Sequence, residues 1–316
     1  MNNDNTAPVD LLLTQPVPDA IDAQLVQDYR VHRLYQHDNP QQLLNEVGPR
    51  IRGVVTGGAK GLSNALMDQL PALQIIAISG IGTDAVDLRH AAARGVHVTT
   101  TPGVLTDDVA DMAIGLIIST LRRLGEGERL VRDGLWGTVN LPLARKVTGI
   151  ELGIVGLGQV GQAIARRAAA FDMRIAYNDR REKPEYGYRF VADLTELARS
   201  VDVLVLAASA DDGKAIVTAQ VLEALGPDGY LINVARGKLV DEDALVEALR
   251  EGRIAGAGLD VFVDEPNVPP ALRDLHQVSL QPHRASATLQ TRLEMGRMVL
   301  QNLEACLRGE TPPNCA

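Results

Sequence analysis

Short apolar runs alternate with segments of helical periodicity along most of the chain. In the first third, four apolar runs predict strands, at residues 9–13, 53–56, 73–78 and 96–99. Three segments between them predict helices, at residues 20–29, 41–47 and 64–70. Strands that alternate with helices form parallel sheets with helices on both faces, so this part is expected to have an α/β fold.

A second series of the same kind begins near Gly149. Six further strands are predicted, at residues 153–155, 174–177, 201–207, 230–233, 254–260 and 278–280. Helices fit the segments between them, at residues 162–170, 195–199, 219–225 and 242–250. Six strands with intervening helices are what a doubly wound dinucleotide-binding domain needs. A strongly apolar helix is predicted before this series, at residues 107–124, and another helix after it, at residues 288–308.

These patterns predict two doubly wound parallel-sheet domains. Because the last helix is expected to return to the first series, the cofactor domain is inserted in the other one. We expect a flavodoxin-like substrate domain made of residues 1–98 and 286–316. Residues 99–285 would form the Rossmann domain, including the apolar helix at residues 107–124.

Composition excludes several classes of function. The 316 residues are 46% hydrophobic, and the net charge is −9 without a basic block, which argues against nucleic acid or an anionic membrane as a partner. Charged residues interrupt the apolar stretches well before the length of a membrane span, and residues 1–10 lack the pattern of a signal peptide. Cys306 and Cys315 have neither metal-ligand spacing nor a disulfide framework. We therefore expect a cytoplasmic protein without a metal.

The sequence GIVGLGQVG at residues 153–161 is the first candidate for chemistry. A strand, a glycine-rich turn and a helix start are the context in which G-x-G-x-x-G indicates dinucleotide binding. Gly156 permits a tight turn, Gly158 lets a pyrophosphate approach the backbone, and Gly161 lets helix and strand pack closely. An ordinary βα turn is the alternative. We expect the turn to contact the cofactor, together with Leu157, Gln159 and Val160.

The next strand ends in the sequence AYNDRR, which bears on the choice of cofactor. An acid at this point accepts hydrogen bonds from the ribose 2′-OH of NAD, whereas arginine neutralises the 2′-phosphate of NADP. Asn178 stands where the acid is expected, and Arg180 and Arg181 follow it. Asp179 argues the other way because a carboxylate repels a phosphate, and a solvated turn of mixed charge is the alternative. The pattern favours NADPH, with NADH as the second choice.

Three further polar motifs follow strands of the second series, where open α/β sheets bind ligands. They are NVARG at residues 233–237, GLDVFVDEP at 258–266 and QPHRAS at 281–286. On these motifs the chain resembles the D-2-hydroxyacid dehydrogenase family, whose active site uses the arginine, the glutamate and the histidine. The resemblance implies that Arg236, Glu265 and His283 are catalytic, and it extends from residue 79 to the last helix.

The chemistry of this family explains the three residue types. Hydride addition to a 2-keto acid leaves negative charge on the carbonyl oxygen, which must then be protonated. A histidine suits this task because imidazole exchanges protons near neutral pH. Glu265 would fix the ring from its other side, and Arg236 would bind the substrate carboxylate and carbonyl. Alone, each could be structural: a salt bridge, a solvated loop residue and a buried histidine. All three in order favour catalysis.

The resemblance also implies supporting positions. Asp260 would hold the nicotinamide carboxamide, and further cofactor contacts are expected from Thr106, Ala207, Val234, Ala235, Arg236 and His283. The backbone of Ile81 and Gly82 would receive the substrate carboxylate. Other substrate contacts are expected from Gly57, Gly58, Arg236, His283 and Ser286, of which Ser286 could instead be a helix cap.

Within the family, the chain resembles the hydroxypyruvate and glyoxylate reductases, including plant-type enzymes that also take hydroxyphenylpyruvate. This branch prefers NADPH and is usually dimeric, so a homodimer is expected, with the apolar face of residues 112–121 in the interface. Trp136 either reaches the partner's active site or packs in the interface or core. The chain departs from the family pattern at two places. Arg284 is expected to alter the substrate pocket, and residues 209–212 the contacts with the cofactor.

Two other readings compete with this one. The first is an NAD-linked dehydrogenase for another acid, of the hydroxyphenylpyruvate, D-lactate or phosphoglycerate type. The second is a non-catalytic protein that senses a dinucleotide. The sequence does not decide which 2-keto acid is the substrate or which direction the reaction takes.

Overall fold

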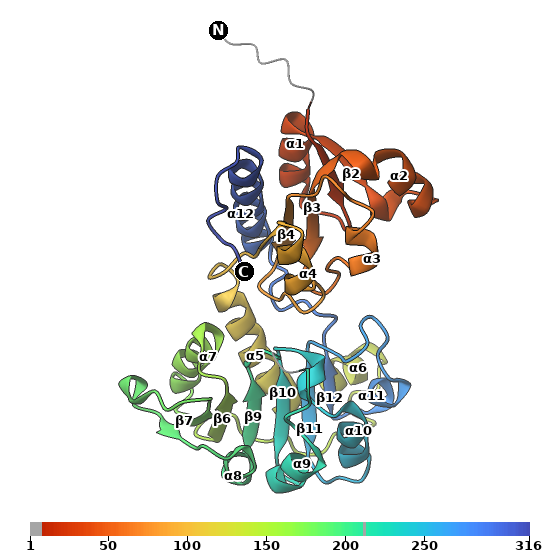
Figure 1. The fold of residues 1–316 in the computed structure, drawn as a ribbon. Helices are drawn as coiled ribbons and strands as arrows, with labels where there is room; N and C mark the ends of the chain where they lie inside the picture. The colour runs from red at the N-terminus through yellow and green to blue at the C-terminus, as the bar shows by residue number, and fades with distance from the viewer. Residues whose placement is uncertain (1–7, 211–212) are drawn as a thin grey trace. The chain divides into compact units, whose positions relative to one another are not determined.

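The computed structural model describes residues 8–210 and 213–316, and the chain divides into two compact units (Figure 1). Unit 1 holds the chain up to Leu105 and again from Ala287, and unit 2 is the continuous stretch Thr106–Ser286. Most of the N-terminal segment considered for a signal peptide lies outside the described residues. Asp211 and Asp212 of the departure at residues 209–212 also lie outside them.

Unit 1 is built on a five-stranded parallel sheet with the order β2-β1-β3-β4-β5. Its strands are β1 (Asp10–Leu13), β2 (Arg30–Arg33), β3 (Ile51–Gly57), β4 (Ile75–Ser79) and β5 (His97–Thr99). Its helices are α1 (Asp19–Asp28), α2 (Pro40–Val47), α3 (Asn64–Met67), α4 (Leu88–Ala93) and α12 (Leu289–Leu307). This strand order is that of flavodoxin-like folds, in which the order reverses between β1 and β3.

Both faces of the unit 1 sheet are buried, which explains its continuous apolar runs. Leu12 and Val54 face one hydrophobic cluster, and Leu11 and Val55 face the other, because successive strand residues point to opposite faces. The second cluster includes residues of α1 and α12, which pack closely at Gly296, where an added Cβ would lie 2.4 Å from the Ile21 side chain. The last helix is therefore part of unit 1.

Unit 2 contains a seven-stranded parallel sheet with the order β12-β11-β10-β9-β6-β7-β8. Its strands are β6 (Glu151–Val155), β7 (Arg174–Asn178), β8 (Arg189–Phe190), β9 (Val203–Leu206), β10 (Tyr230–Asn233), β11 (Gly256–Leu259) and β12 (Val278–Leu280). The first six, in chain order, have the 3-2-1-4-5-6 arrangement of a dinucleotide-binding fold. The order reverses between β6 and β9, where such sheets bind ligands beyond the carboxyl ends of the strands.

Helices cover both faces of the unit 2 sheet. They are α5 (Thr106–Leu121), α6 (Leu124–Arg132), α7 (Gln159–Ala169), α8 (Leu194–Arg199), α9 (Ala219–Leu225), α10 (Glu242–Arg250) and α11 (Pro270–Asp274). On one side, α8, α9 and α10 contribute to a large buried cluster with the strands. On the other, α5 packs against α7, β10, β11 and β12. The apolar face of α5 is thus largely buried inside unit 2.

The two parallel-sheet units confirm the predicted α/β fold class. All ten predicted strands are present, with shifted ends, but β2 and β8 were not predicted. β2 reads RVHR and lies at the edge of its sheet, where its charged side chains pair with Asp10 and Asp22. β8 has two residues, too few to show an alternation. No helix in the described part of the chain is long and apolar enough to cross a membrane.

Candidate active site

The glycine-rich turn joins β6 to α7 at the point where the strand order of unit 2 reverses. Gly156 has a φ of 90°, and an added Cβ there would lie 2.8 Å from the backbone of Ala208, which follows β9. A Cβ on Gly161 would lie 2.0 Å from the carbonyl oxygen of Gly156. Both glycines are therefore required by close backbone packing, and the turn lies beside Ala207.

Gly158 is glycine for a different reason. Apart from its chain neighbours and the nearby backbone of α7, none of the described residues has an atom within 4 Å of a Cβ built on it, and its φ of −78° suits any residue. It is the N-cap of α7, and no side chain of the described residues caps the helix there. The first turn of a helix presents free N–H groups and a partial positive charge. The open space and the uncapped helix start fit the pyrophosphate of a dinucleotide.

The residues considered for ribose recognition, at the end of β7 and just after it, differ in their surroundings. The Asn178 side chain donates hydrogen bonds to the carbonyl oxygens of Val191 and Ala192, each at 2.9 Å, so its amide nitrogen supports the loop after β8. Arg180 and Arg181 are exposed. The two arginines thus lie on the surface directly after the strand whose end reads the ribose in this fold.

Asp179 is turned toward the glycine-rich turn. Its carboxylate accepts hydrogen bonds from the backbone N–H of Leu157 at 2.9 Å and from Lys183 Nζ at 2.8 Å. Burial alone would raise the pKa of Asp179, but the hydrogen bonds from Lys183, Leu157 and Arg180 outweigh it and lower the pKa below its ordinary value. Asp179 is therefore an ionised carboxylate whose two oxygens both accept hydrogen bonds.

Glu265 and His283 form a close pair. The Nδ1 atom of His283 lies 2.6 Å from Oε2 of Glu265, and Oε1 of Glu265 accepts a hydrogen bond from the N–H of Phe262 at 3.0 Å. Burial raises the pKa of Glu265, yet the hydrogen bonds from His283 and Phe262, with the charges of His283 and Arg236, bring the pKa below its ordinary value. The glutamate is more buried than the imidazole, at 24% against 39% exposed side chain. The ring can thus face a substrate while the carboxylate holds it.

The backbone of His283 is held in an unusual conformation. Its φ is 51°, in the left-handed region that non-glycine residues rarely adopt. The N–H of His283 donates to the carbonyl of Asp260 at 2.8 Å. The carboxylate of Asp260 then accepts the N–H groups of Arg284 at 2.7 Å and Ala285 at 2.9 Å. Asp260 thus holds the loop that carries the histidine, and its own burial raises its pKa.

Arg236 follows β10 in a turn that Asn233 closes. The Asn233 side chain accepts the N–H of Ala235 at 3.0 Å and donates to the carbonyl of Arg236 at 2.9 Å. An added Cβ on Gly237 would lie 1.9 Å from the carbonyl carbon of Phe262, so only glycine lets the two loops meet. This approach brings Arg236 near the segment that carries Glu265, and its charge contributes to the low pKa of that glutamate.

The remaining predicted residues fall in two places. Val234 and Ala235 are buried in the turn before Arg236, and Thr106 is the first residue of α5. Ser286 ends unit 2 and does not cap α12, whose N-cap is Thr288. The other substrate residues, Gly57, Gly58, Ile81 and Gly82, belong to unit 1.

In unit 1, the predicted substrate residues follow neighbouring strands of the sheet. Gly57 ends β3, and the loop after β4 contains Ile81 and Gly82. A Cβ on Gly58 would lie 3.0 Å from the carbonyl oxygen of Gly82, so the two loops are in contact. The unit thus brings its predicted residues together at the carboxyl edge of its own sheet.

Two supporting residues were missed by sequence analysis. Lys183 contacts both Asp179 and the glycine-rich turn, and Glu242 accepts the N–H of Val263 at 3.1 Å, which supports the loop before Glu265. Neither stands in a motif. The signal for Lys183 was a cation four residues after an acid, which is also common on solvated surfaces.

Comparison with known proteins agrees with this geometry. Residues 114–285 match the family model for the NAD binding domain of the D-isomer specific 2-hydroxyacid dehydrogenases. The chain belongs to this family. It is therefore an NAD(P)-dependent dehydrogenase that reduces 2-keto acids and uses a nicotinamide dinucleotide.

Relatives match the dehydrogenase over nearly its whole length. It is 42% identical to 2-ketogluconate reductase of Gluconobacter oxydans, over 96% of both chains. It is 41% identical to glyoxylate/hydroxypyruvate reductase A of Arabidopsis thaliana, over 96% of this chain and 97% of that one. The NADPH-dependent glyoxylate/hydroxypyruvate reductase of Sinorhizobium meliloti, solved with NADP and malonate, superposes with a TM-score of 0.91 at 41% identity, covering 98% of this chain and 97% of that one.

Proposed function

We propose that this dehydrogenase reduces small 2-keto acids, with glyoxylate and hydroxypyruvate as substrates, to D-2-hydroxy acids at the expense of NADPH. The observation that carries the proposal is the close pair in which Nδ1 of His283 lies 2.6 Å from Oε2 of Glu265. The charge of Arg236 also acts on this carboxylate. All three residues belong to loops at the carboxyl ends of strands in unit 2, as does the glycine-rich turn.

Each side chain has a separate task. The bound nicotinamide supplies the hydride. Arg236 binds the substrate carboxylate and carbonyl and stabilises negative charge on the carbonyl oxygen. His283 donates the proton to that oxygen from Nε2, since Nδ1 is held by Glu265. Glu265 lies 2.6 Å from Nδ1 of His283, so the carboxylate orients the ring for this transfer.

Turnover of a panel of 2-keto acids tests this function. We expect the purified protein to oxidise NADPH with glyoxylate and hydroxypyruvate, which relatives at about 40% identity are named for. Hydroxyphenylpyruvate and 2-ketogluconate belong in the panel because other relatives carry those names. A protein that turns over none of these acids with either cofactor would contradict the proposal.

Arg180 and Arg181 support the preference for NADPH, because guanidinium groups pair well with a phosphate. We expect kcat/KM to be higher with NADPH than with NADH. Arg180→Ala should lower the value for NADPH by about tenfold, the equivalent of ~1.4 kcal/mol, and change the value for NADH little. Equal losses with both cofactors would contradict a role in phosphate recognition.

Two glycine substitutions test the proposed cofactor site. Gly158→Ala should fold with native stability but weaken NADPH binding, because its Cβ enters the open space at the start of α7. Gly161→Ala should instead lower the stability by about 1–3 kcal/mol, because its Cβ meets a backbone oxygen. Thermal unfolding and a dinucleotide titration measure both effects. A Gly158→Ala variant that binds NADPH normally would place the cofactor elsewhere.

The supporting residues complete the proposal. In unit 2, Thr106, Ala207, Val234, Ala235 and Asp260 contact the cofactor, with Leu157, Gln159, Val160 and Asn178. Ser286, also in unit 2, supplies a hydroxyl to the substrate. In unit 1, the backbone of Ile81 and Gly82 receives the substrate carboxylate beside Gly58. Unit 2 is accordingly the dinucleotide-binding domain and unit 1 the substrate domain.

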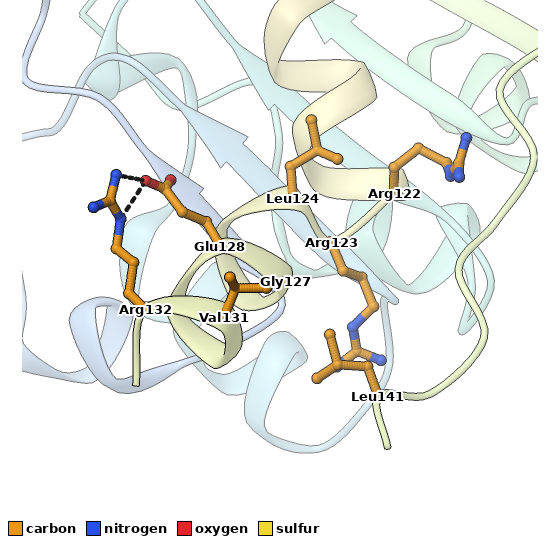
Figure 2. Close-up of a pocket in the computed structure, with 8 residues that line it drawn as sticks. All are labelled: Arg122, Arg123, Leu124, Gly127, Glu128, Val131, Arg132 and Leu141. Atoms are coloured by element: carbon orange, nitrogen blue, oxygen red, sulfur yellow. Dashed lines mark hydrogen bonds and ion pairs between the residues drawn. The ribbon is translucent and has the colours of Figure 1, made fainter. Parts of the chain in front are cut away.

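A homodimer is also part of the proposal, and exposed apolar side chains of unit 2 support it. The apolar face of α5 is largely buried within unit 2. The segment from α6 to residue 143, in contrast, exposes large apolar side chains. Trp136 is 80% exposed and Leu143 100%. A hollow of about 590 Å³ lies beside α6. Figure 2 shows the residues that line it, among them Leu124, Val131 and Leu141 together with charged side chains such as Glu128 and Arg132. An apolar surface of this kind is typical of an interface.

Sedimentation velocity tests the dimer. We expect the wild-type protein to sediment as a dimer and Leu143→Asp to sediment as a monomer, since a charge opposes burial of the exposed segment. Leu289 is also exposed but belongs to unit 1, so Leu289→Asp is the matched control and should remain dimeric. A Leu143→Asp dimer as stable as wild type would place the interface elsewhere.

A further inference from the structure

The backbone N–H and carbonyl of Leu157, between the first two glycines of the glycine-rich turn, are both bound by side chains that follow β7. Its N–H donates to Oδ2 of Asp179 at 2.9 Å, and its carbonyl accepts from Nζ of Lys183 at 2.9 Å. Lys183 also binds the same Oδ2 at 2.8 Å. Both side chains are only 17% exposed. We call this arrangement the Asp179–Lys183 clamp.

The clamp is fixed by its surroundings. The other carboxylate oxygen of Asp179 accepts the N–H of Arg180 at 2.7 Å. The backbone N–H of Lys183 donates to the hydroxyl of Tyr177 at 2.6 Å, and the Tyr177 side chain is fully buried. Lys183 is therefore anchored at its backbone as well as at its ammonium group, which lowers the entropy cost of holding a long side chain in place.

The clamp directly follows β7, where this fold recognises the ribose of the cofactor, so it can affect the choice between NADH and NADPH. Asp179 follows the last residue of β7, where a free carboxylate would accept hydrogen bonds from a ribose 2′-OH and repel a 2′-phosphate. Here the carboxylate already accepts three hydrogen bonds, and the ammonium of Lys183 offsets its charge. The acidic residue that would favour NADH is thus drawn toward the turn.

We propose that Lys183 is a positioning residue that determines cofactor specificity by holding Asp179 against the glycine-rich turn. The inference rests on the proposed use of NADPH. Lys183 acts through Asp179. With Lys183 in place, the 2′-phosphate meets the exposed arginines; without it, the phosphate meets a carboxylate whose charge no ammonium group offsets. Asp179 therefore favours NADH only when Lys183 is absent.

A double-mutant cycle tests this coupling. The variants are Lys183→Met, Asp179→Asn and the double variant, and the readout is the kcat/KM for NADPH divided by that for NADH. We expect Lys183→Met to lower this ratio by about tenfold, since like charges brought together cost at least the ~1.4 kcal/mol that corresponds to that factor. Asp179→Asn alone should change the ratio by less than about threefold, and the double variant should return to the wild-type ratio within about the same factor.

Two controls separate the clamp from other roles of a lysine. Lys183→Arg keeps the charge and should retain the wild-type ratio. Lys146→Met removes a positive charge from an exposed site before β6, and should also leave the ratio unchanged. The neighbouring Arg145 contacts Asp202 and Asp228, which precede β9 and β10, so this site lies at the amino ends of the strands and not at their carboxyl ends. Thermal unfolding of each variant shows whether it is folded.

Three outcomes would overturn the inference. If the double variant keeps the low ratio of Lys183→Met, the lysine binds the phosphate directly. If Lys183→Met lowers kcat/KM equally for both cofactors, or leaves both unchanged, it does not determine the preference. The change in the ratio reports on the clamp even if the wild-type protein prefers NADH, an outcome that would contradict only the proposed cofactor.

Discussion

His283→Ala is expected to abolish most of the reduction of 2-keto acids, with kcat lower by about 10²–10⁴, the usual contribution of a general acid. The physical reason is that no other group on the loop after β12 stands where the imidazole does, on a backbone held at a φ of 51° by Asp260. Steady-state oxidation of NADPH with glyoxylate measures the effect.

The control for this variant is cofactor binding. His283→Ala should still bind NADPH, with a Kd that changes far less than kcat because the turn and α7 are untouched, and it should unfold at a similar temperature. A variant that retains kcat within about threefold of wild type would show that the proton comes from another source, since that change is far below the effect of a general acid.

Glu265→Gln tests whether the ionised carboxylate is needed to hold the ring. It should lower kcat at neutral pH, because a neutral amide binds Nδ1 of His283 less well than a carboxylate does. The pKa of Glu265 lies below its ordinary value, since hydrogen bonds from His283 and Phe262 favour the ionised form, so the advantage of wild type over the variant should persist until the pH falls through that lowered value. A ratio of the two activities that does not change with pH on the acid side would contradict a role for the ionised carboxylate.

Arg236→Ala has the second large expected effect. It should lower kcat/KM for the keto acid by about 10²–10³, the cost of removing one group that stabilises the developing oxyanion. Both kcat and KM should change, because the same guanidinium binds the carboxylate in the ground state. Kinetics at saturating NADPH separate the two parameters.

Arg236→Lys is the matched variant for this prediction. It keeps the positive charge but cannot bind a carboxylate with two parallel hydrogen bonds, so it should recover only part of the activity. Full recovery would show that charge alone is needed. If Arg236→Ala loses no activity, the guanidinium has a structural role, such as supporting the ionised state of Glu265.

Much of the fold follows from local sequence because parallel strands buried on both faces must be apolar throughout. Runs such as those of β4 and β9 are therefore unambiguous. The edge strands β2 and β8 bury less surface and carry charges, so their sequences contain no such signal. The apolar pattern of α5 likewise indicates burial but does not say against what, and much of this face is buried within unit 2.

The candidate site was predictable where a motif fixes the backbone. Gly156, Gly161 and Gly237 each stand where an added Cβ would meet main-chain atoms, so the sequence could indicate these close approaches. The direction of a side chain is set by distant partners instead. Asp179 is directed by Leu157, and Asp260 by the loop after β12, and neither partnership can be read from spacing.

The central claim is that Arg236, Glu265 and His283 act together on a 2-keto acid beside the cofactor. A crystal structure of the complex with NADP⁺ and oxalate, an unreactive analogue of glyoxylate, tests it most directly. The account predicts that Nε2 of His283 and the guanidinium of Arg236 both lie within hydrogen-bond distance of the oxalate, with Glu265 still on Nδ1. Oxalate bound away from these side chains, with NADP⁺ in place on the glycine-rich turn, would contradict it.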